Sequence, residues 1–341
     1  MVSRALAAPK KLLVMRYRFI GDTVLSMPLF LALRQAFPDA QIDALVTRGS
    51  GELLQHWPVI DRLVWLDEPN PQTGKPRTLW QQAQRFRAEG YDTALVLKRS
   101  WSSALMALLA RIPQRVGFSS EGRGLLLTNR IPYSTTMPEV QSFLSALQPW
   151  GVGHGHHPPV FPSPAELLLP AHQHQAQAFW HATREAHPHT RHVGVHCSPS
   201  NTEKQWPASF WVSLFSKLLA EKQDLPPLML HCFGTQQDDA TMRGLVAHLP
   251  ATQHAHIQVH CGRWNLHETV AILQGLDAFI GVDSGPLHLA ALCGLPVVAC
   301  MRPEKIPKWR PNTKHHWLLS TADITLAEAA CRMLLHSVLA H

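Results

Sequence analysis

The chain has 341 residues, of which 45% are hydrophobic, so it is long enough for two domains and is not a disordered protein. Its formal net charge is +7, and residues 1–150 account for all of it, with 18 basic and 11 acidic side chains. This asymmetry predicts an anionic partner for the N-terminal half, such as a phosphorylated glycolipid, a membrane surface or a nucleic acid. The alternative is charge that serves solubility alone.

Cysteine usage and hydropathy indicate a cytoplasmic protein. The six cysteines form no C-x-x-C pair and mostly lie in apolar runs, which favours buried, reduced thiols. The basic residues near the N-terminus are not followed by the apolar segment of a secretory signal. Pro and Gly interrupt the uncharged stretch 284–301, so it is not expected to span a membrane. Peripheral membrane contact remains allowed.

Apolar strands alternate with amphipathic helices in the N-terminal half, as in a parallel sheet covered by helices. Strands are expected at 12–15, 42–46, 63–66 and 93–97, and helices at 22–37, 79–89, 102–111 and 139–150. The stretch 151–170 is rich in Gly, His and Pro and is interpreted as an interdomain linker.

The same alternation restarts after the linker. Strands are expected at 192–196, 228–233, 257–261, 278–282, 297–300 and 317–319, and helices at 174–186, 208–222, 238–248, 266–275, 285–293 and 326–339. The sequence therefore predicts two doubly wound α/β domains, 1–165 and 166–341, facing one another across a cleft, with the C-terminal helix free to pack back on the first domain. Ligands of such sheets bind beyond the carboxyl ends of the strands.

A polar turn follows the apolar run 278–282. Asp283 and Ser284 are favoured helix N-cap types, and Gly285 lets a ligand approach the backbone closely. The N–H groups of the helix start suit a phosphate, and His288 lies one turn further on as a second donor. The alternative is a strand-to-helix cap with a core histidine.

The first strand runs into a basic turn that contains Arg16, Arg18, Gly21 and Asp22. The dinucleotide pattern G-x-G-x-x-G is absent, which disfavours a nicotinamide or flavin enzyme. We interpret Asp22 as placed to cap the following helix. At the carboxyl edge of a sheet, its carboxylate is also a candidate acceptor for a substrate proton.

A loop after the strand 192–196 carries Ser198, Ser200 and Lys204. A lysine there can balance the negative charge that develops on a departing diphosphate, although a surface lysine is the plainer interpretation. The H-x-H spacing of the linker lacks a patterned Asp, Glu or Cys beside it, so we expect neither a metal nor a cofactor.

Four motifs occur in order along the chain: R-x-x-x-x-G-D-x-x-x-x-x-P, F-P-D-A-x-I-D, K-x-W-P and V-D-S-G-P-x-H-x-A-A. Together they resemble the bacterial heptosyltransferases of glycosyltransferase family 9, which build the inner core of lipopolysaccharide. The resemblance covers nearly the whole chain. The Arg-rich start and Trp309-Arg310-Pro311 look most like the branch that adds the third core heptose.

The resemblance implies a GT-B fold, with the acceptor in the first domain and the donor in the second. It implies inverting transfer of heptose from ADP-heptose to a lipopolysaccharide core or lipid A-linked acceptor. It also implies that no metal is needed and that the enzyme works in the cytoplasm, with possible contact at the inner membrane. Asp22 matches the family's candidate base, Lys204 the lysine near the donor phosphates, and Ser284, Gly285 and His288 the phosphate turn.

Two departures from the family pattern touch the donor site. Where the family has S-L-E, with the Glu on the donor ribose, this chain reads Asn265-Leu266-His267-Glu268, so the carboxylate is displaced by one position. Where the family has G-P-T, this chain has Arg302-Pro303-Glu304. The exact nucleotide sugar therefore stays open, as do the acceptor hydroxyl and the oligomeric state.

We predict an inverting glycosyltransferase with Asp22 and Lys204 as catalytic residues. The predicted donor-binding residues are Ser198, Ser200, Lys204, His267, Glu268, Asp283, Ser284, Gly285 and His288. The predicted acceptor-binding residues are Arg16, Arg18, Gly21, Lys98, Arg99, Arg115 and Arg123. The alternatives are a relative with another nucleotide sugar and a catalytically silent sugar-nucleotide-binding protein. A nucleic-acid-binding module is disfavoured because no recognition helix or base-stacking motif is evident.

Overall fold

The computed structural model describes residues 6–16, 18–152, 158–198, 204–220, 226–320 and 323–339. Its contacts divide the chain into two units, Met1–Pro162 and Ser163–His341. The division falls within the Gly-, His- and Pro-rich stretch interpreted as a linker. Ser200 and the linker histidines at 154–157 lie outside the described residues.

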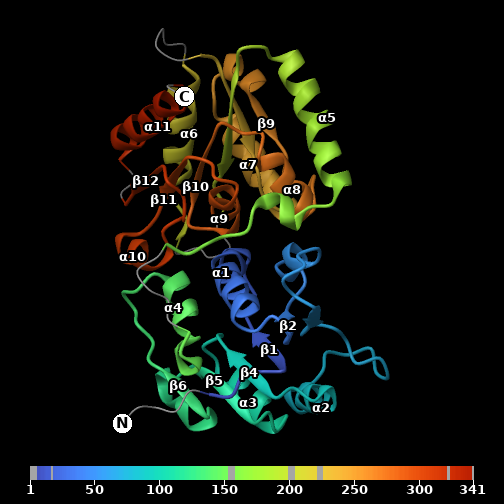
Figure 1. Cartoon of the computed structure of the whole chain (residues 1–341). Helices are drawn as coiled ribbons and strands as arrows, with labels where there is room; N and C mark the ends of the chain where they lie inside the picture. The colour runs from blue at the N-terminus through green and yellow to red at the C-terminus, as the bar shows by residue number, and fades with distance from the viewer. Residues whose placement is uncertain are drawn as a thin grey trace. The chain divides into compact units, whose positions relative to one another are not determined.

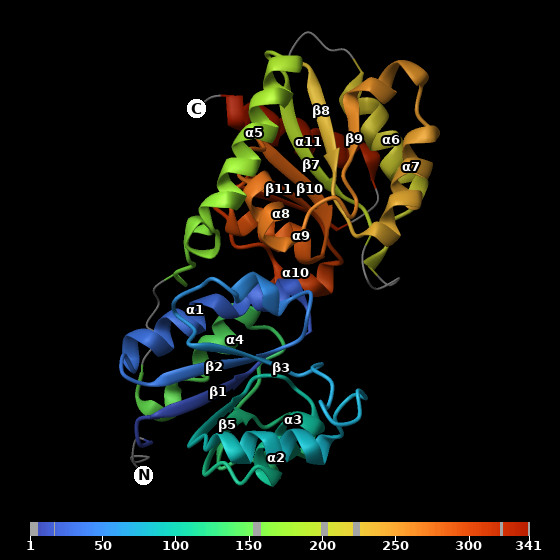
Figure 2. The ribbon, with the colours of Figure 1, turned by 90° about the vertical axis from the view of Figure 1, so that its right-hand side faces the viewer.

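The first unit is built on a six-stranded parallel sheet in the order β3-β2-β1-β4-β5-β6 (Figure 1). Its strands are β1 Lys11–Met15, β2 Gln41–Val46, β3 Arg62–Trp65, β4 Thr93–Val96, β5 Gln114–Phe118 and β6 Asn129–Ile131. Its α-helices are α1 Ile20–Ala36, α2 Leu79–Glu89, α3 Trp101–Leu109 and α4 Glu139–Ser145. Figure 2 shows α1 and α4 on one face of this sheet and α2 and α3 on the other. Strands covered on both faces read as apolar runs, and β1 is buried from Leu12 to Met15.

Two strands of this sheet, β5 and β6, were not predicted from the sequence. The first contains polar residues and Gly117, and the second is a three-residue edge strand. A Cβ on Gly117 would lie 2.6 Å from the carbonyl oxygen of Val96 on β4, so close strand approach requires glycine there. The glycine that weakens the strand signal is thus what allows the strand to pair.

The second unit repeats this topology with the order β12-β11-β10-β7-β8-β9, again all parallel. Its strands are β7 Arg191–His196, β8 Leu228–Cys232, β9 Ile257–Val259, β10 Ala278–Val282, β11 Val297–Cys300 and β12 His316–Leu319. Its α-helices are α5 Pro170–Ala186, α6 Ala208–Leu219, α7 Asp239–Ala247, α8 Leu266–Leu273, α9 Gly285–Leu292, α10 Ile306–Trp309 and α11 Ile324–Leu339. In both units the strand order reverses between the first and fourth strands, which is where doubly wound sheets bind ligands.

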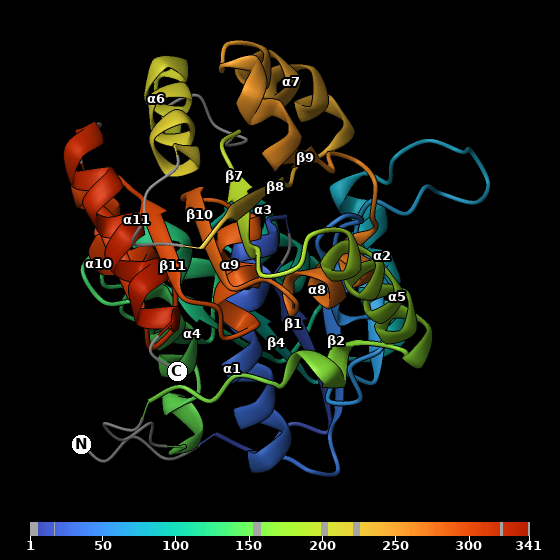
Figure 3. The ribbon, with the colours of Figure 1, turned by 90° about the horizontal axis from the view of Figure 1, so that it is seen from above.

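The two faces of the second sheet differ in chemistry. Figure 3 shows α6, α7 and α11 on one face and α5, α8 and α9 on the other. The α6–α7–α11 face is an apolar core that includes Trp211, Met242 and Cys331. The opposite face buries His192 and His231 beneath α5. The C-terminal helix α11 packs within this unit, against α6 and strands β10–β12.

Candidate functional site

The carboxyl end of β1 brings together an arginine and an aspartate. Arg16 follows the strand directly, and its guanidinium forms an ion pair with the carboxylate of Asp22 on α1. Each of these side chains is only 10% exposed. The guanidinium also lies over the ring of Phe143 on α4, 5.2 Å from its centroid. The predicted base and one predicted phosphate ligand are therefore bound to each other.

The helix that carries Asp22 begins earlier than the sequence predicted. Its N-cap is Phe19 in an extended conformation, and no side chain makes a capping hydrogen bond. Asp22 is the third helical residue, so the prediction that it caps the helix was wrong. Aspartate is a favoured cap type, but its carboxylate here turns to Arg16. The carboxylate is buried against Arg16, with Lys98 also close enough to interact with it, and it takes no part in capping.

Two further predicted cations lie at the same edge, after β4. The backbone N–H of Lys98 donates to the carbonyl oxygen of Met15 (3.1 Å), which ties this loop to the end of β1. Burial and the neighbouring cations Arg18 and Arg16 lower the pKa of Lys98 to about 8. The guanidinium of Arg99 lies 4.1 Å from the centroid of the Tyr133 ring. Positive charge therefore gathers where the strand order reverses.

Arg18 extends this cluster and has an unusual backbone. It is exposed, and its φ of 122° is rare for a residue with a Cβ. Such a conformation costs about 1–3 kcal/mol and persists where the surroundings impose it. Strained residues of this kind gather at ligand sites, which is consistent with the predicted role of Arg18. Gly21 is the second residue of α1, beside the same turn.

Two other predicted phosphate ligands hold the fold together instead. Arg115 lies near the amino end of β5 and donates to the carbonyl oxygens of Ile112 (2.6 Å) and Leu126 (2.8 Å). Arg123 is 2% exposed and donates to the backbone and hydroxyl of Ser120. Both guanidinium groups are engaged by oxygens of their own loops, although Arg123 lies near Arg99, since burial and the charge of Arg99 lower the pKa of Arg123. Sequence alone does not reveal these contacts, because it shows that a side chain is charged but not where that side chain points.

The carboxyl end of the second sheet places Lys204 beside Asp283. The ammonium lies 2.8 Å from Oδ2 of Asp283, and Nζ donates to the backbone carbonyl of the same residue (3.2 Å). Nε2 of His288 lies 3.9 Å from Oδ1. Burial favours the neutral acid, yet His288 and Lys204 together hold the pKa of Asp283 below its ordinary value. The loop after β7 and the turn after β10 thus converge on one ionised carboxylate.

His288 lies in a different environment from the one predicted. It is 3% exposed, because it occupies the fourth position of α9 on the side that packs into the unit. Its imidazole is directed to Asp283 rather than to open space. The alternative interpretation, a buried histidine, describes its position better than an exposed second donor does.

The start of α9 has the features of an anion site. Ser284 is the N-cap and Gly285 and Pro286 begin the helix, so the free N–H groups of the first turn are those of Ser284, Gly285 and Leu287. Pro286 contributes none. Ser284, Gly285 and Pro286 are partly exposed, whereas the following residues are buried. Anions are favoured at such a position by the helix dipole.

One residue of this site, His196, was missed by the sequence analysis. It ends β7, is 5% exposed, and its Nδ1 lies 2.9 Å from Oγ of Ser284. Burial lowers the pKa of His196 to about 4, so the ring is neutral at pH 7. Nearby, Oγ of Ser198 is buried and has no hydrogen-bond partner among the described residues. A polar residue at the end of an apolar strand is the signal that was available for His196.

The displaced carboxylate Glu268 lies at the start of α8. Asn265 is the N-cap, and its backbone N–H donates to Oε2 of Glu268 (2.8 Å) while its own side chain accepts from the Glu268 N–H (2.9 Å). This is a capping box. The ring of His267 is buried and stacks on His172, with centroids 5.2 Å apart. The carboxylate thus already has a structural role, and only its second oxygen is left for a ligand.

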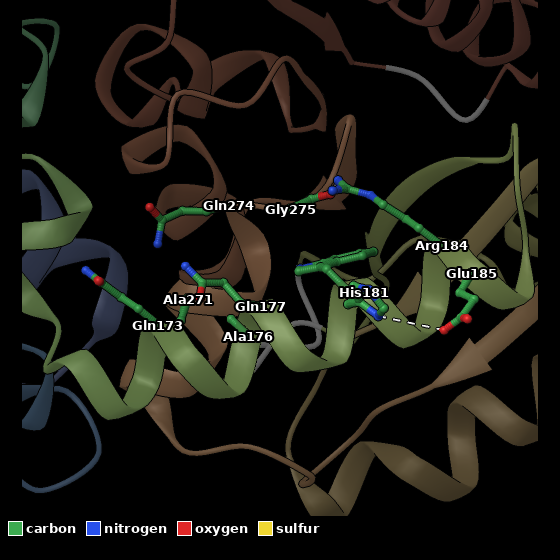
Figure 4. A pocket seen from close by; sticks show the side chains of 10 residues that line it. Gln173, Ala176, Gln177, His181, Arg184, Glu185, Ala271, Gln274 and Gly275 are labelled. Carbon is green, nitrogen blue, oxygen red and sulfur yellow. Dashed lines mark hydrogen bonds and ion pairs between the residues drawn. The ribbon is translucent and has the colours of Figure 1, made fainter.

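A depression of about 750 Å³ lies elsewhere on the second unit (Figure 4). It runs between α5 and the end of α8, toward the amino ends of the strands. Trp180 and Arg184 of α5 border it and donate to the carbonyl oxygens of Ile272 in the last turn of α8 (2.9 Å) and of Gly275 just after the helix (3.0 Å). These contacts stabilise the end of a helix, and the depression contains none of the predicted site residues.

The described part of the chain shows neither a metal-binding cluster nor a bilayer-spanning helix. Within it, no group of three or more His, Cys, Asp or Glu side chains is arranged to hold a metal ion. Among the helices of the same residues, none combines the length and hydropathy needed to cross a bilayer.

Comparison with known proteins agrees with this geometry. The profile of Glycosyltransferase family 9 (heptosyltransferase) matches residues 79–333. The lipopolysaccharide heptosyltransferase 2 of Salmonella typhimurium is 26% identical, over 89% of this chain and 86% of that protein. The lipopolysaccharide heptosyltransferase 3 of Escherichia coli K12 is 24% identical, over 87% of this chain and 84% of that protein.

The fold is also shared with a solved structure. The ADP-heptose lipopolysaccharide heptosyltransferase II of E. coli superposes with a TM-score of 0.74 at 20% identity, covering 96% of this chain and 99% of that one. Together with the two doubly wound sheets, this likeness confirms the GT-B fold class; the facing arrangement of the two domains stays a prediction. The chain is a glycosyltransferase and belongs to glycosyltransferase family 9, the heptosyltransferase family.

Proposed function

We propose that the protein transfers a heptose from ADP-heptose to the inner core of lipopolysaccharide with inversion at the anomeric carbon. The acceptor is assigned to the first unit and the donor to the second. The proposal rests on one feature of each unit: the first has a buried carboxylate in a cationic turn, and the second has a lysine beside a helix start suited to an anion. The relatives named above act on lipopolysaccharide and include both heptosyltransferases 2 and 3, so the step in core assembly is for experiment to decide.

On the donor side, the leaving ADP gains negative charge as the glycosidic bond breaks. The N–H groups of Ser284 and Gly285 and the ammonium of Lys204 are fixed before the reaction, so they stabilise that charge without reorganising. Asp283 anchors Lys204, and His196 orients the Ser284 hydroxyl. We assign to these groups the stabilisation of the negative charge on the diphosphate, and we propose that no metal or cofactor takes part. Turnover is therefore expected to persist in EDTA.

On the acceptor side, Asp22 is assigned the proton of the attacking hydroxyl. Its neighbours explain how a phosphorylated core sugar would be recognised. Arg18, Lys98 and Arg99 present positive charge at the same sheet edge. This sharpens the sequence prediction, because Arg115 and Arg123 are engaged within the fold. An anionic acceptor would also be compatible with contact at the cytoplasmic face of the inner membrane.

The test is an activity panel read by mass spectrometry. Purified protein is incubated with ADP-heptose, other ADP-sugars and UDP-sugars against core acceptors that carry zero, one or two heptoses. We expect product only with ADP-heptose and only with an acceptor that already carries heptose. Product from another nucleotide sugar would favour the alternative donor. No product from any pair, with tight ADP binding retained, would favour a silent sugar-nucleotide-binding protein. Anomeric configuration of the product, read by NMR, tests inversion.

A further inference from the structure

We infer that Arg16 is a positioning residue, which holds the Asp22 carboxylate in place rather than binding the phosphate of the acceptor. The inference rests on the proposed function, because it takes Asp22 as the base. It reassigns a residue that the sequence placed among the phosphate ligands. Arg16 and Asp22 lie six positions apart across the β1–α1 turn, yet their charged groups meet.

Asp22 has few other means of being held. The start of α1 has no side-chain cap, so no capping hydrogen bond fixes this carboxylate. A general base must keep its oxygen within hydrogen-bond reach of the proton that it takes. The ion pair with Arg16 supplies that constraint. Because both side chains are 90% shielded from solvent, water does not readily replace the contact.

Arg16 is itself held on its other side. Its guanidinium lies against the face of Phe143, a residue of α4 with no exposed surface. A cation over an aromatic ring is favoured, and more so away from water. The guanidinium is therefore clamped at two points, by the carboxylate at Nη2 and by the aromatic ring. A residue free to search for a phosphate would not be expected to be held at both.

The other cations of the cluster are better suited to phosphate. Arg18 is exposed, and Lys98 and Arg99 follow the neighbouring strand. Nε of Arg16 is buried without a hydrogen-bond partner among the described residues. The competing hypothesis is therefore that this N–H donates to a phosphate oxygen of the acceptor. The two uses differ in a measurable way: a phosphate ligand matters only when the acceptor carries phosphate, whereas a positioning residue matters for every acceptor.

The experiment compares Arg16→Gln with Arg99→Gln on phosphorylated and dephosphorylated core acceptors. We expect Arg16→Gln to lower kcat about 10- to 100-fold on both acceptors, as for a misplaced catalytic group, with little change in acceptor KM. Arg16→Lys, which keeps the charge but not the planar fork, should recover part of the loss. Arg99→Gln should raise KM on the phosphorylated acceptor alone. An Arg16→Gln defect confined to KM on the phosphorylated acceptor would overturn the inference.

Further variants and a measurement of ADP affinity keep the outcome interpretable. Phe143→Leu removes the ring face without altering charge and should lower kcat several-fold on both acceptors; unchanged kcat would contradict the proposed clamp. ADP affinity, a property assigned to the second unit, should be unchanged in every variant. Arg16→Gln combined with Asp22→Asn should be no slower than Asp22→Asn alone, because the two act as one unit. Full turnover by Asp22→Asn would instead refute the proposed base, whatever Arg16 does.

Discussion

The two sheets have the same strand order, but the polar groups at their carboxyl ends differ in kind. At the first, Arg18, Lys98 and Arg99 gather around a single buried ion pair. At the second, Lys204 is joined to an ionised aspartate, and the remaining polarity comes from helix N–H groups and a neutral histidine. The first edge presents side-chain positive charge, which suits the anionic acceptor proposed for it, and the second presents fixed N–H dipoles, which suit the proposed leaving group. One topology thus supports two chemistries because the differences lie in the turns.

The largest expected effect tests the first edge. Asp22→Asn keeps the shape of the side chain but removes its ability to accept a proton. We expect kcat to fall by about 10²-fold or more, with ADP affinity unchanged. Turnover should be measured across pH, with ADP binding followed by calorimetry. Near-normal turnover with an unchanged pH profile would show that the charge at this edge serves recognition alone.

The second edge should respond to Lys204→Ala with a smaller loss. We expect the chemical rate to fall about 10- to 30-fold while donor affinity falls less, since fixed charge is worth more in the transition state. Single-turnover kinetics separate the two effects. Because this variant leaves Asp283 without its cation, the double variant Lys204→Ala/Asp283→Asn is the matched control. If both variants lost affinity and rate equally, Lys204 would bind the ground state only.

The interiors of the two units extend the comparison. In the first, Asp43 of β2 is fully buried and is bound by Arg62 (2.9 Å) and by the hydroxyl of Tyr91 (2.7 Å). In the second, the corresponding second strand buries His231, which bonds to Nδ1 of His192 and Nε2 of His260, each at 3.0 Å. Within otherwise apolar cores, the buried polar contacts described here are an ion pair with a phenol in the first unit and imidazole rings in the second.

This difference predicts that the second unit is the more acid-sensitive. Burial lowers the pKa of His231 to about 2 and that of His260 to about 4. An unfolded histidine binds a proton near pH 6.5, so the folded unit loses stability as pH falls from about 6.5 toward these values. In the first unit, the hydrogen bond from Arg62 lowers the pKa of Glu89 below 4.5, so that contribution persists until pH falls below about 4.5.

Hydrogen exchange at pH 7 and pH 5 measures this directly in the full chain. Peptides from β7–β9 should lose protection by about 1–3 kcal/mol at pH 5, while those from β1–β4 change little. His231→Leu should reduce this loss, whereas His181→Gln, an exposed control on α5, should not. Equal loss in both sheets would remove the contrast between the two interiors.

The sequence predicted the α/β class and ten of the strands because apolar runs and helix starts are local signals. It did not predict β5 and β6, whose polar residues and Gly117 hide the pattern. The site residues were predicted by type and position along strand ends. Their directions were not: Arg115 and Arg123 bind their own loops, and His288 is buried. Glu268 is instructive, since Asn265 three residues before it forms a recognisable capping box. Direction depends on packing between distant segments, which local spacing does not encode.

The smallest expected effect concerns salt and the acceptor phosphate. If Arg18, Lys98 and Arg99 recognise phosphate, removing that group should raise acceptor KM several-fold, as exposed charge pairs contribute about 1 kcal/mol each at most. Raising ionic strength from about 0.05 M to 0.5 M should weaken binding of the phosphorylated acceptor and leave the dephosphorylated one nearly unaffected, because screening acts on the charge pair.

The salt dependence of donor KM is the comparison. The start of α9, where we propose that the donor diphosphate binds, is partly exposed but offers N–H groups together with Lys204, so the salt dependence of donor KM should be shallower. Equal KM values for the two acceptors at low salt would show that the excess positive charge of residues 1–150 does not recognise the acceptor phosphate.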